Sequence, residues 1–196
     1  MIEYVLNIDI YGIIFSILLI FANFLIILTG RKREDLEFSK LLILAGIINI
    51  VHIIFLFFYP GIYFSQPAGE EIQEIYDYFI RSALIVYIIP IITYGILFIL
   101  IGIKNRDKQG IILISSGIFW IVYYSFLINS WMGEYSYFFE GTPIMFIRIS
   151  YLTAYIFGFI AALIFLFYSI KLNEKNLKIC GILFLTYSII QIILFF

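Results

Sequence analysis

Apolar and polar positions alternate along the chain in long blocks, not in the short periods of an amphipathic surface helix or strand. Apolar runs of about 20 residues are separated by segments that hold nearly every ionisable side chain. A helix needs about 20 apolar residues to cross a hydrocarbon core of roughly 30 Å. The pattern therefore predicts six transmembrane helices. They lie at residues 8–29, 41–59, 80–103, 111–130, 146–170 and 179–196.

Composition supports lipid as the solvent of most side chains. Hydrophobic residues make up 64% of the 196-residue chain, and charged residues only 13%. A soluble domain averages about 25% charged residues, so this chain has too few to cover a water-exposed surface. We therefore expect an all-α polytopic membrane protein that forms a single helical-bundle domain over residues 1–196. The formal net charge of -1 offers no basic excess, which sets nucleic acid binding aside.

Basic residues gather in every second connector. Ten of the 12 lysines and arginines fall between the first and second, third and fourth, or fifth and sixth predicted spans. The positive-inside rule makes these three connectors cytoplasmic. The predicted topology is therefore three hairpins with both termini outside. Heavy use of isoleucine and phenylalanine is compatible with an AT-rich genome, so we expect a multi-pass protein in the cell membrane of a prokaryote.

The hairpins resemble one another in sequence. The triplet Phe-Ile-Arg at residues 79–81 recurs at 146–148, and residues 29–33 resemble residues 101–106 more loosely. Parallel membrane repeats can enclose a central site at their shared interface. The alternative is that apolar sequence of low complexity imitates repetition, since a fixed period is the expected signature of a repeat and these matches are few.

Asn49 and His52 form the most informative polar pair within a predicted span. A separation of three places both on one helical face, so they can jointly face the bundle interior. His52 is the one histidine of the chain and could bind a ligand, while the alternative is an interhelical hydrogen bond that packs the bundle. Candidate partners for such a bond are Asn23, Thr93, Ser115, Ser116, Tyr123 and Gln191.

Arg81 and Arg148 occupy corresponding positions at the predicted external ends of the third and fifth spans. Asp77 lies four residues before Arg81 and can pair with it on the same helix face. One interpretation is that both arginines are snorkelling anchors at the membrane surface. The other is a polar mouth, shared with His52, for an anionic ligand that enters from outside.

The fifth span carries a small residue at every fourth position. The four residues are Ser150, Ala154, Gly158 and Ala162. Such a stripe lets a second helix approach closely. It predicts a tight helix contact within the bundle, with a partner membrane subunit or with a second copy of the chain.

Pro90 interrupts the third predicted span. Its ring removes the backbone hydrogen bond that would reach the carbonyl of Val86, so we expect a bend there. The freed carbonyl then either lines a cavity or accepts a bond from Thr93 or a neighbouring group.

Catalytic constellations are missing from the sequence. No Asp, Glu, Lys or Arg lies near the middle of a predicted span, which argues against a proton pump or a carboxylate-driven exchanger. One histidine and one cysteine on different spans cannot supply the three or four ligands of a zinc site. Neither a metalloprotease HExxH motif nor a phosphate-binding glycine loop occurs. We therefore expect no enzyme activity, no metal and no cofactor.

The segment from Gly46 to His52 follows a basic turn and is succeeded by Tyr59-Pro60-Gly61. It resembles the membrane-associated sensor domains at the front of some archaeal and bacterial histidine kinases. The resemblance implies a sensing role and places His52 in an Asp-x-x-His motif at the outer end of a span. Here Asn49 stands at the aspartate position, and the spacing from His52 to Tyr59 is longer than in that family.

Together these patterns favour a non-enzymatic integral membrane module that binds or senses a small ligand within its bundle. Asn49, His52, Arg81 and Arg148 are the candidate ligand-binding residues. A transporter or substrate-capture subunit is the second hypothesis. The third is an accessory subunit of a larger membrane complex, in which the polar residues within the spans only pack.

The predicted topology can be tested at position 106, in the second basic turn. A cysteine that replaces Arg106 is expected to resist a membrane-impermeant thiol reagent added to intact cells, because the turn is cytoplasmic. Permeabilised cells should show labelling. Labelling of intact cells would reverse the predicted orientation.

Overall fold

The computed structural model describes residues 10–33, 38–58, 86–104, 108–140 and 143–196, and the predicted all-α class is confirmed. Residues 86–90 are helical and lead directly into the π-helix η1. The helices of the described residues are α2 (Ile10–Lys32), α3 (Ser39–Phe58), η1 (Ile91–Ile96), α6 (Leu97–Lys104), α7 (Lys108–Glu140), α8 (Ile144–Lys171) and α9 (Lys175–Phe195).

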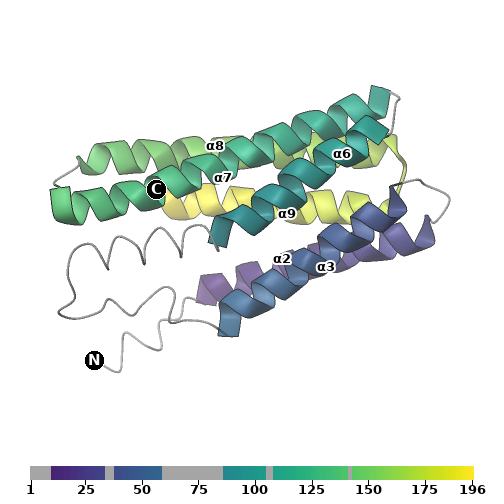
Figure 1. The fold of residues 1–196 in the computed structure, drawn as a ribbon, viewed down its shortest axis with the longest axis horizontal. Coiled ribbons are helices and arrows are strands. Elements are labelled where there is room, and N and C mark those ends of the chain that lie inside the picture. The colour runs from purple at the N-terminus through teal and green to yellow at the C-terminus, as the bar shows by residue number, and fades with distance from the viewer. Residues whose placement is uncertain (1–9, 34–37, 59–85, 105–107, 141–142) are drawn as a thin grey trace.

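The helices follow one another around the bundle in chain order (Figure 1). The most extensive helix–helix interfaces are those of α7 with α8, α2 with α3, and α8 with α9. Contact between α2 and α9 brings the first and last hairpins together. Arg33 and Glu174 strengthen this closure, since Arg33 Nη1 donates to Glu174 Oε1 at 2.6 Å. The helices form a closed ring, and its least extensive interface is the seam between α3 and the η1–α6 segment.

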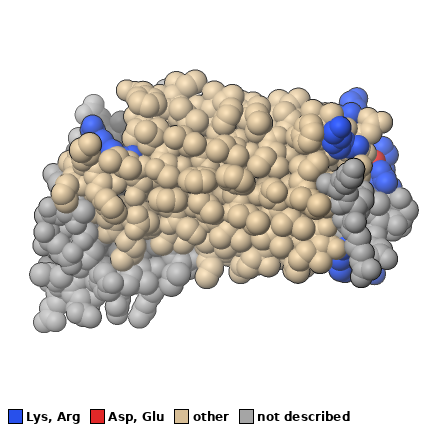
Figure 2. Space-filling model, turned by 90° about the horizontal axis from the view of Figure 1, so that it is seen from above, with Lys and Arg blue, Asp and Glu red and all other residues tan. Residues whose placement is uncertain are grey.

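The outer surface of the bundle is apolar. Isoleucine, leucine and phenylalanine side chains are exposed along every helix, for example Ile88, Ile92, Ile96 and Leu100 at every fourth position of one segment. On the face seen in Figure 2, the middle of the described part carries no Lys, Arg, Asp or Glu, and lysine and arginine lie near its two ends. Water would not stabilise such a surface, whereas hydrocarbon matches it.

Within the described residues, five helices are long and apolar enough to cross a membrane. The apolar part of α3 runs from Ser39 to Phe55 and is shorter than these five. The five candidate spans are Ile13–Lys32, Val86–Lys104, Gln109–Ser130, Ile144–Lys171 and Lys175–Phe195.

Most helix boundaries lie within about three residues of the predicted spans, and two differ by more. Helix α7 continues to Glu140, ten residues past the predicted span 111–130, because no proline or glycine pair stops it before Gly141. Its apolar part still ends at Ser130. Helix α9 begins at Lys175 instead of residue 179, because Asn173 adopts a φ of 57° and closes a tight turn after α8.

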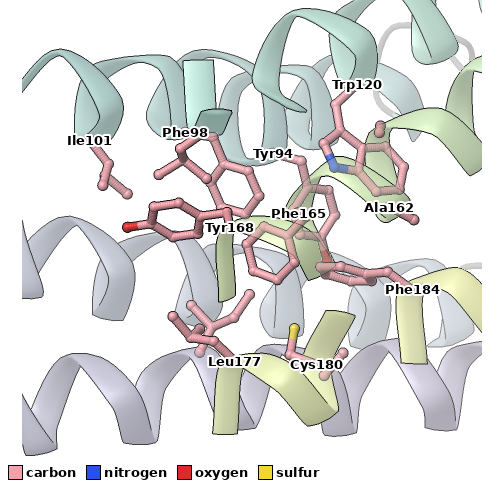
Figure 3. Close-up of a cluster of buried hydrophobic side chains, with 14 of the residues drawn as sticks. Tyr94, Phe98, Ile101, Trp120, Ala162, Phe165, Tyr168, Leu177, Cys180 and Phe184 are labelled. Carbon is pink, nitrogen blue, oxygen red and sulfur yellow. The ribbon is translucent and has the colours of Figure 1, made fainter. Parts of the chain in front are cut away.

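An aromatic core fills the bundle interior between the cavity described below and the basic turns (Figure 3). Phe98 and Phe165 stack with centroids 5.2 Å apart, and Phe165 meets Phe184 edge-on at 5.5 Å. Trp120 contacts Phe184 at 5.7 Å. Each such pair adds about 0.5–1.5 kcal/mol to the free energy of area burial. These contacts tie α6, α7, α8 and α9 into one unit.

Glycines let the helices of the first two hairpins cross closely, and both hairpins cross in the same way. A Cβ on Gly46 of α3 would lie 2.8 Å from the Asn23 carbonyl oxygen, and a Cβ on Gly117 of α7 would lie 2.7 Å from that of Gly95. Nearer the turns, Gly30 and Gly102 make the equivalent close approaches, to the Ser39 and Gly110 carbonyl oxygens respectively. The two hairpins therefore share one packing geometry.

A methyl group should not fit at this crossing. We expect Gly117→Ala to lower the melting temperature of the protein in detergent, because overpacking costs about 1–3 kcal/mol and outweighs the ~1 kcal/mol that alanine gains in helix propensity. Gly133→Ala is the matched control, since its Cβ would meet only Ile147 Cγ1, at 3.2 Å. Equal melting temperatures for the two variants would contradict the crossing geometry.

Candidate functional site

A cavity of about 280 Å³ lies in the half of the bundle away from the basic turns. Each of α2, α3, α7, α8, α9 and residues 86–96 contributes to its wall, so the complete ring of helices is needed to form it. Seven tyrosines dominate the lining. The lining residues are Leu19, Asn49, His52, Ile53, Val86, Tyr87, Pro90, Tyr94, Tyr123, Tyr124, Leu127, Tyr151, Tyr155, Tyr187 and Gln191.

Asn49 and His52, the pair singled out by the sequence, both line this cavity from α3. Both side chains are buried. Thr93 Oγ1 donates to Asn49 Oδ1 at 2.6 Å and so bridges the seam between α3 and η1. Asn49 Nδ2 is buried and has no hydrogen-bond partner among the residues that the structure describes. The amide therefore combines a packing bond on one atom with an unused donor on the other.

The π-helix η1 presents residues to both neighbouring helices of the first hairpin. Where a bend was expected after Pro90, the chain forms a wider turn, and the Leu97 N–H donates to the Ile92 carbonyl five residues earlier. Thr93 thereby reaches Asn49 on α3, and Tyr94 Oη accepts from Asn23 Nδ2 on α2 at 2.5 Å. The helical distortion thus positions polar contacts across the thin seam.

A second polar chain joins α7 to α9 at the cavity wall. Tyr123 Oη donates to Gln191 Oε1 at 3.0 Å, and Gln191 Nε2 donates to Tyr187 Oη at 2.8 Å. Both ends of the glutamine amide are used in these bonds. Gln191 therefore fixes the direction of two tyrosine hydroxyl groups that border the cavity.

The small residues of the predicted stripe on α8 are buried against α7. Asn129 Nδ2 of α7 donates to Ser150 Oγ at 3.0 Å. Gly158 lies under the ring of Tyr123, where a Cβ would come within 2.9 Å of Tyr123 Cδ2. Ala154 and Ala162 are fully buried. The stripe faces the interior of the bundle and lets the Tyr123 ring lie flat at the cavity wall.

Of the two arginines of the sequence-based site, only Arg148 is among the described residues, and it does not line this cavity. Arg148 is exposed at the start of α8 and borders a separate hollow with Met145 and Phe196. Arg81 lies outside the described residues. The lining of the tyrosine cavity contains no Asp, Glu, Lys or Arg among described residues. His52 is the one basic side chain of the described lining.

Metal chemistry has no support in the described ranges, where no group of three His, Cys, Asp or Glu side chains gathers. Cys180 is fully buried in the aromatic core and does not line the cavity. The arrangement offers hydrogen bonds and aromatic surface, which are the means of binding a small molecule.

Sequence reasoning found Asn49, His52, Tyr123 and Gln191 but not the other six tyrosines of the lining. Tyrosine is common at membrane interfaces, so its presence in the outer half of a span is read first as anchoring. A signal was available in the spacing, because Tyr151 and Tyr155 lie one turn apart on α8. Only the packed bundle tells which rings face inward.

Comparisons with family models, curated proteins and solved structures gave no match for this chain. The resemblance of the Gly46–His52 segment to kinase sensor domains therefore stays a prediction.

Loss of the Thr93 hydroxyl should weaken the seam. Thr93→Val keeps the side-chain shape but leaves Asn49 Oδ1 buried without its donor, which costs about 1–3 kcal/mol. We expect a lower melting temperature in detergent than for Thr153→Val, whose hydroxyl donates only to the Ile149 carbonyl of its own helix. If the two variants have the same melting temperature, the hydrogen bond between Thr93 and Asn49 does not stabilise the bundle.

Proposed function

We propose that this chain is a non-enzymatic integral membrane module that binds a small ligand in the tyrosine-lined cavity. The observation that carries the proposal is the unused, buried Asn49 Nδ2 at the wall of that cavity. A buried polar atom without a partner costs about 1–3 kcal/mol, and a ligand with a hydrogen-bond acceptor would recover it. The aromatic wall supplies the apolar contact that small-molecule sites use.

The proposed topology has six spans in three hairpins, with both termini outside the cytoplasm of a prokaryotic cell. Helix α3 supplies the sixth span, since its 20 residues rise about 30 Å, the thickness of the hydrocarbon core. It lies along α2 over its length (Figure 1). In this orientation the cavity belongs to the external half of the membrane, because the basic turns lie at the opposite end of the helices.

Binding is favoured over passage by the aromatic core on the cytoplasmic side of the cavity. Phe98, Phe165 and Phe184 pack there with no more than 1% of any side chain exposed. A transport path would have to cross this packed layer, and tightly packed interiors resist such opening. We therefore place transport second.

The third hypothesis, an accessory subunit, requires that the polar residues within the spans only pack, and the unused Asn49 Nδ2 does not fit that expectation. The small-residue stripe on α8, which was expected to dock the partner of a transporter subunit, is already occupied by α7. A sensor remains consistent with a ligand-sized cavity, and the resemblance of the Gly46–His52 segment agrees with it.

The proposal can be tested by native mass spectrometry of the full chain purified from the cells that express it. We expect a bound species of small mass on the unaltered protein and its loss from His52→Leu, because His52 lines the cavity. Ser125→Leu on the exposed side of α7 is the control and should keep the bound species. An unliganded wild-type protein, or equal occupancy of the two variants, would count against the proposal.

A further inference from the structure

The proposed cavity has a wall whose chemistry restricts the ligand it can take. We infer that it binds a small uncharged molecule with a planar face and a hydrogen-bond acceptor of the carbonyl type. This inference rests on the proposed binding function and narrows it to one class of ligand.

Charge is the first restriction. The described lining holds no Asp, Glu, Lys or Arg, its one basic side chain is His52, and Arg148 borders a different hollow. Moving an ion from water into such an interior costs several kcal/mol. Tyrosine rings can return about 2 kcal/mol to a cation through cation–π contact and offer an anion nothing comparable. The balance therefore favours an uncharged ligand over either ion.

Hydrogen bonding is the second restriction. The Asn49 amide has its oxygen occupied by Thr93 and its Nδ2 donor unused, and Asn49 is only 1% exposed. The partner for that donor must be an acceptor. Gln191 Oε1 accepts from Tyr123 and is not bonded to Asn49 Nδ2. A carbonyl oxygen of the ligand would satisfy Asn49 without carrying charge into the cavity.

Shape is the third restriction. The rings of Tyr151 and Tyr155 stack with centroids 6.0 Å apart, and those of Tyr123 and Tyr124 meet edge-on at 4.6 Å. Faces and edges of aromatic rings both attract a further ring in offset or T-shaped contact. A volume of about 280 Å³ lies at the lower end of small-molecule sites, which run from roughly 300 to 1,000 Å³. The ligand is therefore small and planar.

The test compares three probes of nearly equal size on the full chain in lipid nanodiscs at neutral pH, with empty nanodiscs as the blank. Benzamide is uncharged and carries a carbonyl group, benzoate is its anionic counterpart, and benzamidinium is a cation of the same size and planar shape. We expect isothermal titration to give benzamide an affinity at least tenfold higher than either ion. The comparison uses the unaltered chain, so it needs no variant to fold.

A variant then tests the role of the amide. Asn49→Leu should weaken benzamide binding at least fivefold, while Asn129→Leu, a matched change outside the cavity lining, should leave it unchanged. Tighter or equal binding of either ion would overturn the ligand class while leaving the proposed binding function intact. Failure of all three probes to bind at millimolar concentration would also overturn the ligand class. The proposed binding function is tested separately, by whether native mass spectrometry detects a bound species on the unaltered protein. Unaltered binding by Asn49→Leu would overturn the role of its donor.

Discussion

Lipid offers no hydrogen-bond partner, and this constraint orders the whole bundle. Polar side chains of the apolar helices turn inward, where Asn23, Asn49 and Thr93 are buried. Many serine and threonine hydroxyls bond within their own helix, as Ser188 does to the Phe184 carbonyl. The asparagines are too polar for that solution alone and reach across helices to Tyr94 and Thr93. Two interhelical hydrogen bonds thus join the η1 segment to α2 and α3, and others join α7 to α8 and α9.

The helices could be predicted from the sequence because the thickness of the hydrocarbon core sets how many consecutive apolar residues a spanning helix needs. Apolar length and charge position located the helices to within a few residues, apart from the start of α9 and the extension of α7 to Glu140. The extension of α7 follows the end of its apolar part at Ser130, and the hydrocarbon thickness does not limit the length of a helix there. The π-turn after Pro90 was also beyond the sequence, which indicated only a broken hydrogen bond.

The site could be predicted in part. The separation of three residues placed Asn49 and His52 on one face of a helix, and both line the cavity in the structure. Arg148 was grouped with them because it lies near the same end of its span. That grouping uses depth in the membrane and ignores direction around the helix. Exposed Arg148 shows that residues at one depth can face opposite ways.

The first two hairpins agree where they cross and differ where they meet the cavity. Gly46 and Gly117 lie 71 residues apart and make the same close approach to a carbonyl oxygen of the preceding helix. At the same offset, the cavity lining replaces His52 by Tyr123 and Ile53 by Tyr124. Two copies of one packing unit thus present different chemistry to a shared interior. The two hairpins also have different neighbours, because α2 packs against α9 whereas α7 packs against α8, so equal packing at the crossings does not require equal residues at the cavity.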